Sequence, residues 1–149
     1  SEAFMAAERL LSWYNRRVYL EQREEKAVDF NAAITDIFEG IRAGLRARGA
    51  NVPHLKAFAS GIDGDFFKAS LTGVDYPIEY DRKLTGSYSA LSVIINARAA
   101  ADAELMASVV DDAIDSVCLN YALKHRTFFL ENFGMMDQGR GNGGRASRF

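Results

Sequence analysis

Histidine and cysteine, the side chains that most readily act as a general base or a nucleophile near neutral pH, are few in this 149-residue chain: His54, His125 and Cys118. A histidine acts as a general base when a nucleophile and an orienting partner lie within hydrogen-bond reach. Neither histidine has a recognisable partner of this kind nearby in the sequence. We therefore predict that the protein is not an enzyme and has no catalytic residue, and we keep a small hydrolase using His54 or His125 as one alternative.

Metal and cofactor sites are not indicated either. One cysteine excludes an internal disulfide, and one thiol with two histidines gives too few soft ligands for a structural zinc site. Asp111 and Asp115 stand at i, i+4 with Asp112 beside them, a spacing at which carboxylates can share a divalent ion. Hard-cation sites usually take further oxygens from a second element, so we interpret the three as a solvated helix face. We predict no metal and no cofactor, and we expect Cys118 to be buried.

The last twelve residues, 138–149, contain four glycines, three arginines and no acidic residue. Their G-x-G-x-x-G match lacks the strand before it and the helix after it that a dinucleotide site needs. Such a composition cannot build a core, so we expect an arm that a neighbouring chain orders. Residues 102–117 hold five acids and no base and are its electrostatic complement. The contact residues predicted for the arm are Arg140, Arg145, Arg148 and Phe149.

The overall composition describes one domain. Of its residues 48% are hydrophobic and 26% charged, and 18 basic against 20 acidic residues give a net charge of −2. That balance excludes a wholesale nucleic-acid coat and a polybasic membrane binder. No signal-peptide pattern is present at the start, and no apolar run approaches the ~18–20 residues that a membrane helix needs. We expect no membrane partner.

Helical periodicity marks three segments of the chain. Apolar residues at spacings of three and four predict a first helix over residues 3–27 and a second over about 30–47, which Asp29 can cap. A third amphipathic helix is predicted over residues 100–124.

Between the second and third helices the period changes to that of strands. Asp63-Gly64 is a strong hairpin signal, and Pro77, which has no N–H for a ladder, confines its strand to a sheet edge. The apolar, aromatic segment Thr127–Met136 follows the last helix. The four predicted strands, each joined locally to the next, cover Leu55–Ile62, Asp65–Thr72, Val74–Tyr80 and Ser87–Asn96.

Together these elements predict an α+β fold. It has two N-terminal helices, a four-stranded antiparallel meander, a long C-terminal helix packed on the sheet, and an extended C-terminal arm. We divide the chain into residues 1–28 as an N-terminal helix or extension, 29–136 as the core domain, and 137–149 as the Gly/Arg-rich arm.

Part of this pattern resembles a known family. The run Phe66–Tyr76, the loop to Leu84–Tyr88, the strand Ala90–Ile95 and the following helix are similar to the tail-terminator, or tail-completion, proteins of tailed bacteriophages. Members of that family usually carry an amphipathic helix before an antiparallel sheet and a long helix packed across it. Ile34–Leu45 would be the preceding helix here. The first helix and the Arg/Gly arm depart from the family pattern.

The resemblance implies a non-enzymatic structural protein of a phage-like particle. Such a protein forms a ring, typically a homohexamer, at the head–tail connection, and belongs to a virion assembled in the host cytoplasm. Sheet edges and arms would then meet neighbouring copies or other virion proteins. The docking residues expected on the helices are Arg42, Arg46, Arg48, Asp111, Asp112 and Asp115.

A second alternative is a binding module of another class. The Arg/Gly arm beside aromatic residues suggests single-stranded nucleic acid, which binds through arginine–phosphate contacts and stacking, or a chaperone-type role. Three arginines are few, and the near-neutral balance of the chain lacks the basic stripe typical of such proteins.

Overall fold

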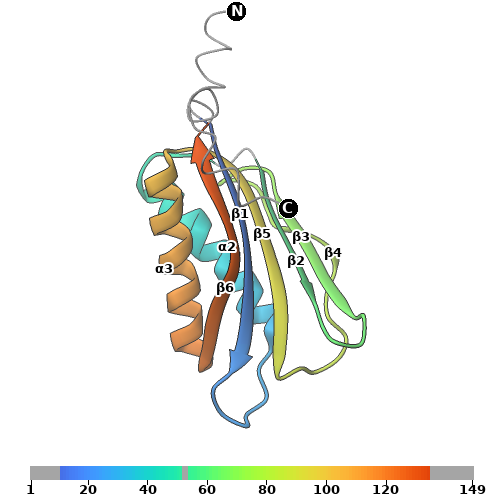
Figure 1. The fold of residues 1–149 in the computed structure, drawn as a ribbon. Helices are drawn as coiled ribbons and strands as arrows, with labels where there is room; N and C mark the ends of the chain where they lie inside the picture. The colour runs from blue at the N-terminus through green and yellow to red at the C-terminus, as the bar shows by residue number, and fades with distance from the viewer. Residues whose placement is uncertain (1–10, 52–53, 135–149) are drawn as a thin grey trace, which may run out of the picture.

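The computed structural model describes residues 11–51 and 54–134, and in this part of the chain six strands form one antiparallel sheet. The order of the strands is β4-β3-β2-β5-β1-β6. Two helices, α2 (Phe30–Ala47) and α3 (Ala103–Tyr121), pack on the same face of the sheet (Figure 1). The strands are β1 (Leu11–Gln22), β2 (His54–Ser60), β3 (Phe66–Leu71), β4 (Glu79–Arg82), β5 (Ala90–Ala100) and β6 (Leu123–Gly134).

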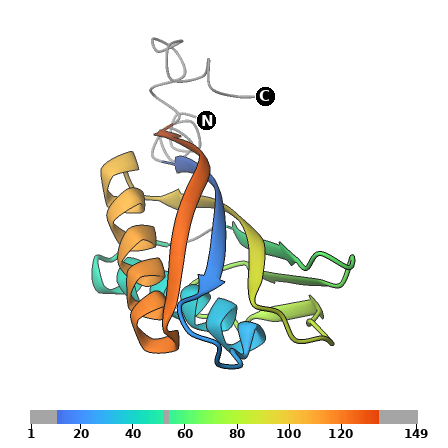
Figure 2. The ribbon, with the colours of Figure 1, turned by 60° about the horizontal axis from the view of Figure 1, so that its bottom comes forward.

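The core lies between the sheet and the helix layer. Alternate residues of β2, β3 and β5 are buried, as expected for strands with one covered face. Phe67, Leu55 and Ile95 come from the sheet side of this core, and Phe38 and Met106 from the helix side. Figure 2 shows the two layers, with both helices on one side of the curved sheet. Burial of these apolar side chains is the dominant stabilising term of the fold.

The two helices approach each other closely where α2 carries glycine. A Cβ at Gly40 would lie 3.0 Å from Cβ of Ala113, and one at Gly44 would lie 2.9 Å from Cγ1 of Val109. Both distances are below ordinary van der Waals contact. The absent side chains therefore set the distance between α2 and α3, which lets both helices reach the same sheet face.

The prediction of a helix over 30–47 is confirmed. The Asp29 side chain caps its first turn by accepting a hydrogen bond from the Ala32 backbone N–H at 3.1 Å. Beyond the C-terminal end, Gly49 adopts a left-handed φ of +67°. The stripe that contains Ile34, Ile37 and Ile41 is buried against the sheet.

The prediction of a helix over residues 3–27 is wrong, because residues 11–22 form the strand β1. β1 lies between β5 and β6 and is therefore an internal strand of the sheet. The strand is hard to recognise because its residues do not alternate between apolar and polar. Two positions on the covered face are the polar Ser12 and Arg16, whereas the aromatic Trp13 and Tyr19 point to the other face. The part of that prediction over residues 3–10 lies outside the described residues.

The four-stranded meander is also wrong. β2 and β3 form the predicted hairpin, but the predicted strand Val74–Tyr80 is largely a turn. The edge strand is instead β4, which has only four residues, all exposed, and does not contain Pro77. β5 does not pair with β4; it returns to the middle of the sheet and pairs with β2 and β1. The reason is burial: β5 places Leu91, Val93 and Ile95 under the helices, which an edge position would leave partly exposed.

The long helix is not the C-terminal element of the fold, which corrects the last part of the predicted architecture. α3 ends at Tyr121, and Ala122 turns the chain with a left-handed φ of 54°. Leu123 then begins β6, which pairs along β1 with a bulge between Arg17 and Val18. The aromatic segment Thr127–Met136 is therefore largely an edge strand, with Met135 and Met136 outside the described residues.

Candidate functional site

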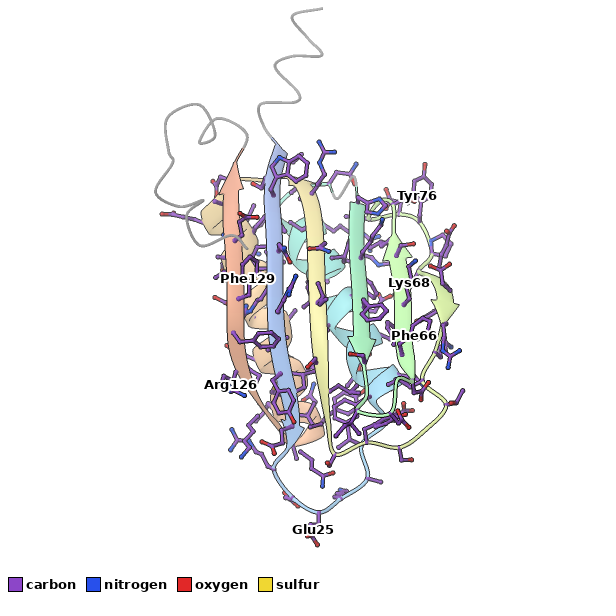
Figure 3. All side chains as sticks on the ribbon, turned by 45° about the vertical axis from the view of Figure 1, so that its right-hand side comes forward. Glu25, Phe66, Lys68, Tyr76, Arg126 and Phe129 are labelled. Atoms are coloured by element: carbon purple, nitrogen blue, oxygen red, sulfur yellow. The ribbon has the colours of Figure 1, made fainter. Side chains whose placement is uncertain are left out.

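One face of the sheet carries the helices, and the other has no element over it in the described part of the chain (Figure 3). We call this surface the open face. Because side chains alternate along each strand, the open face receives about every second residue of the strands, and β4 adds Glu79 and Arg82. Figure 3 shows Phe66 and Lys68 on β3 and Arg126 and Phe129 on β6 standing on it.

The strand register arranges the open-face residues in rows that cross the sheet. Adjacent rows are two residues apart along each strand, a separation of about 7 Å. From β2 through β5 and β1 to β6 the rows read His54–Arg98–Trp13, then Lys56–Asn96–Asn15–Glu131, then Phe58–Ile94–Arg17–Phe129, then Ser60–Ser92–Tyr19–Arg126.

Positive charge collects on the open face although the whole chain has a net charge of −2. The register places three acidic residues there, Glu21, Glu79 and Glu131. The basic residues of the same face are more numerous: Arg17, Lys56, Lys68, Arg82, Arg98, Lys124 and Arg126. Burial and the nearby charges of Lys56 and Arg98 lower the pKa of His54, so its imidazole is neutral at pH 7.

Four arginines of the open face lie over aromatic rings. The guanidinium carbon is 4.1 Å from the ring centroid for Arg98 on Trp13 and 4.5 Å for Arg82 on Phe66. The corresponding distances are 5.4 Å for Arg17 on Phe129 and 5.7 Å for Arg126 on Tyr19. Phe58 and Phe66 also stack, with centroids 5.4 Å apart. All of these contacts lie within the range of cation–π and aromatic attraction.

The helix layer has the opposite character. The exposed side chains of α3 include Asp111, Asp112 and Asp115, and no basic residue lies on this helix. Asp111 accepts a hydrogen bond from the buried Arg16 at 2.5 Å, and Asp115 contacts Nε2 of His125 at 2.9 Å. Two of the three carboxylates predicted to meet a partner therefore have a contact within the chain.

The arginines predicted as docking residues on α2 also have contacts within the chain. Arg42 donates to the carbonyl oxygens of Val74 and Tyr76, and Arg46 donates to that of Val74 and contacts Asp75. Arg42 and Arg46 thus hold the loop between β3 and β4 against the helix. Arg48 is exposed and donates to Gly44 of its own helix. Arg140, Arg145, Arg148 and Phe149 lie outside the described residues.

The two histidines lie far apart in the sheet. His54 is on the open face opposite Arg98, whereas His125 is on β6 beside α3. His125 shares a cavity of about 400 Å³ with Asp115 and Cys118, so a base, an orienting carboxylate and a thiol meet there. Burial, with the Asp115 charge as a smaller cause, raises the pKa of Cys118 to about 11. The thiol is therefore protonated at neutral pH and is a poor nucleophile.

Two further findings concern the residues that the structure describes. Among them, no three His, Cys, Asp or Glu side chains gather closely enough to hold a metal ion. Neither helix is sufficiently long and apolar to span a membrane.

The sequence matches no protein-family model and no curated protein. Function must therefore be argued from the geometry of the open face itself.

Most open-face residues were missed as candidates from the sequence. Trp13, Arg17 and Tyr19 lie within residues 3–27, for which apolar residues at spacings of three and four predict a helix. On β2 and β3, by contrast, the strands were predicted correctly, and the alternation of Lys56 with Leu55 and of Lys68 with Phe67 could have indicated an uncovered face. Which strands are neighbours could not be read from that alternation.

Proposed function

We propose that the protein is a non-enzymatic binding protein whose open face binds single-stranded nucleic acid. The observation that carries the proposal is the set of four arginine–aromatic pairs on one uncovered sheet face. Proteins that bind single strands combine cations that follow the phosphates with aromatic rings on which bases stack. Here both kinds of group alternate within contact distance of each other.

The extent of the paired surface suits a strand of several nucleotides. Three of the pairs include a residue of β1, from Trp13 at one end to Tyr19 at the other, which spans about 20 Å of strand. The fourth pair, Arg82 with Phe66, continues the surface across the sheet to β3 and β4. A nucleotide can stack its base on a ring or guanidinium plane while its phosphate accepts hydrogen bonds from the guanidinium edge.

Protein partners fit the composition of the face less well. A second copy facing it with its own open face would oppose seven cations with seven cations, which like-charge repulsion disfavours. An acidic protein surface, such as the α3 side of another copy, is complementary in charge. Protein interfaces are however depleted in lysine, and the open face carries Lys56, Lys68 and Lys124. Nucleic acid is therefore the ligand that we favour.

The proposal is tested by the anisotropy of a labelled single-stranded oligonucleotide titrated with the full chain at several salt concentrations. We expect affinity to fall steeply with salt, and Lys56→Glu or Lys68→Glu to weaken binding several-fold and reduce the salt slope by ~0.7 for each lost phosphate contact. Arg48→Glu on α2 is the matched control, because it changes the net charge equally but lies off the face.

A second arm of the same titration tests stacking. Phe58→Ala removes a half-exposed ring of the open face, whereas Phe128→Ala removes an exposed ring at the β6 bulge. We expect only Phe58→Ala to weaken binding, by ~1–3 kcal/mol. Binding that is absent, insensitive to salt, or equally reduced by Arg48→Glu and Phe128→Ala contradicts the proposal. Salt-sensitive self-association without oligonucleotide binding would instead favour the α3 side of another copy as the partner.

The oligomeric structural role implied by the phage tail-terminator resemblance stays a second proposal, and one observation favours it. β6 is a 12-residue edge strand, and Phe128 and Leu130 on it are about half exposed. A long apolar edge is a template for strand pairing with another copy. The mass of the protein in solution tests it, with Leu130→Lys expected to favour the monomer. A wild-type chain that stays monomeric at high concentration contradicts it.

A further inference from the structure

A cavity of about 300 Å³ opens on the open face across four strands. It lies over the second row, in which Lys56, Asn96, Asn15 and Glu131 are neighbours, and next to the first row with its Arg98–Trp13 pair. The volume is at the lower end of the range for small-molecule sites, so the cavity suits one planar group rather than an extended ligand. Its side-chain lining comprises Trp13, Asn15, His54, Lys56, Asn96, Arg98 and Glu131.

Two polar atoms in this lining are buried without a hydrogen-bond partner. They are Oδ1 of Asn15 and Nε2 of His54. A buried polar atom without a partner costs free energy, and such atoms in a cavity indicate where a bound group would make hydrogen bonds. Since the His54 imidazole is neutral at pH 7, its Nε2 can either donate or accept according to the tautomer.

We propose that this cavity holds one base of the bound strand and prefers a base with an exocyclic amino group. The inference rests on the proposed function and adds a specificity position to it. Asn15 Oδ1 is an acceptor, the Glu131 carboxylate is an acceptor, and an amino group of adenine, cytosine or guanine donates to such atoms. Uracil and thymine have no amino group, and on their Watson–Crick edge a single ring N–H lies between two carbonyl oxygens, which these acceptors disfavour.

The first row explains how a base would be held flat. Trp13, with Arg98 over its ring, lines the cavity and provides an aromatic wall beside the second row. Stacking on this wall does not depend on which base is bound, whereas Asn15 and Asn96 of the second row contact the hydrogen-bonding edge of the base. Affinity and preference therefore come from different side chains and can be separated by mutation.

The experiment measures the full chain with labelled oligo(dA), oligo(dC) and oligo(dT) of equal length. We expect binding to oligo(dA) or oligo(dC) to be about tenfold tighter than to oligo(dT). Asn15→Ala should abolish that preference while the salt dependence remains. Asn15→Thr provides a second variant that suits a strand and lacks the amide, and thermal melting checks that both fold. Lys68→Ala is the control, since it should weaken all three oligonucleotides equally.

The outcomes separate the two proposals. If no oligonucleotide binds, the proposed function fails. If all bind with equal affinity, or if the preference survives both Asn15 variants, the base-reading cavity is overturned while strand binding stands. A last arm uses the mononucleotides AMP and CMP. Competition by these at concentrations near the oligonucleotide Kd would mean that the cavity takes a free nucleotide, which overturns its assignment to a base within a strand.

Discussion

The two faces of the sheet are built from the same strands and have different surroundings. Phe66 and Phe67 are adjacent on β3, yet Phe67 is fully buried under the helices whereas Phe66 lies on the open face beneath Arg82. On the covered face the side chains pack against α2 and α3. On the open face they pair cations with rings that no other element of the described chain covers. Alternate residues of one strand can therefore serve stability on one face and, in the function that we propose, binding on the other.

Charge divides in the same way. The helix layer carries exposed acidic residues on α3, and the open face carries basic residues, with arginines over aromatic rings. A net charge near zero therefore describes two surfaces of opposite sign, and the single-strand binding that we propose would depend on one of them alone.

The largest expected effect tests the division of labour between the faces. Phe67→Ala removes a fully buried ring and should lower the free energy of unfolding by ~3–5 kcal/mol. Phe66→Ala, one residue away, should cost about 1 kcal/mol or less, because its ring is only partly buried. Denaturant unfolding measures both. Equal losses would show that the open face is covered in solution and would break the comparison.

A smaller effect is expected at the end of the sheet where Asp65 precedes β3. This buried carboxylate accepts hydrogen bonds from the Tyr88 hydroxyl at 2.7 Å, from the Gly86 and Thr85 backbone N–H groups at 2.9 Å each, and from Arg82 at 3.1 Å. The Tyr88 hydroxyl is the largest cause that holds the pKa of Asp65 well below its ordinary value, followed by the Gly86 amide. The ionised form is therefore the one that the fold stabilises.

Because the folded-state pKa of Asp65 is depressed, its contribution to stability is present above the ordinary carboxyl pKa of ~3.9 and is lost as the pH falls below it. Asp65→Asn should lower the Tm by several degrees at pH 7 and flatten the fall of the Tm below pH 4. The exposed Asp81→Asn is the control and should change neither quantity. Thermal melts between pH 2 and 7 measure both, and an unchanged acid limb in Asp65→Asn would refute the assignment.

The smallest effect concerns the acidic face of α3. Asp111→Ala removes the carboxylate that pairs with the buried Arg16 and should cost ~1–2 kcal/mol, reduced by the exposure of Asp111 to solvent. Asp112→Ala changes the neighbouring acid, for which the structure shows no contact, and should stay within ~0.5 kcal/mol. Urea unfolding compares the two. If Asp112→Ala lowers the free energy of unfolding as much as Asp111→Ala does, the acidic residues of α3 act through their summed charge and not through the ion pair with Arg16.

How far the fold follows from local sequence differs between α2 and β1. In α2 the apolar stripe and the Asp29 cap agree, so periodicity predicts the helix to its ends. In β1 the apolar spacing predicts a helix, whereas the residues that are buried alternate as in a strand and include the charged Arg16. Arg16 is buried because it contacts Tyr14, Thr127 and Asp111, which lie on three different elements. No local pattern can show that a charged residue will find those partners.

The candidate site shows the same limit. The lysines and aromatic residues of β2 and β3 could be read from correctly predicted strands. The rings and cations of β1 and β6 could not, since one segment was assigned to a helix and the other was given no regular structure. Arg42 and Arg46, which the sequence predicted as contacts for a partner, instead donate hydrogen bonds to the loop between β3 and β4, which is distant in the sequence.

The amino-acid sequence by itself determined the helix α2, the β2–β3 hairpin, the scarcity of catalytic groups and the near-zero net charge. Those properties depend on composition or on residues a few positions apart. The tertiary structure alone decided that β5 and β1 lie side by side in the middle of the sheet, and so that Trp13 faces Arg98 and Asn15 faces Asn96. The physical reason is that these pairs join residues about 80 positions apart, so no local pattern specifies them. Their register is set because the other face of both strands has to be buried under the helices.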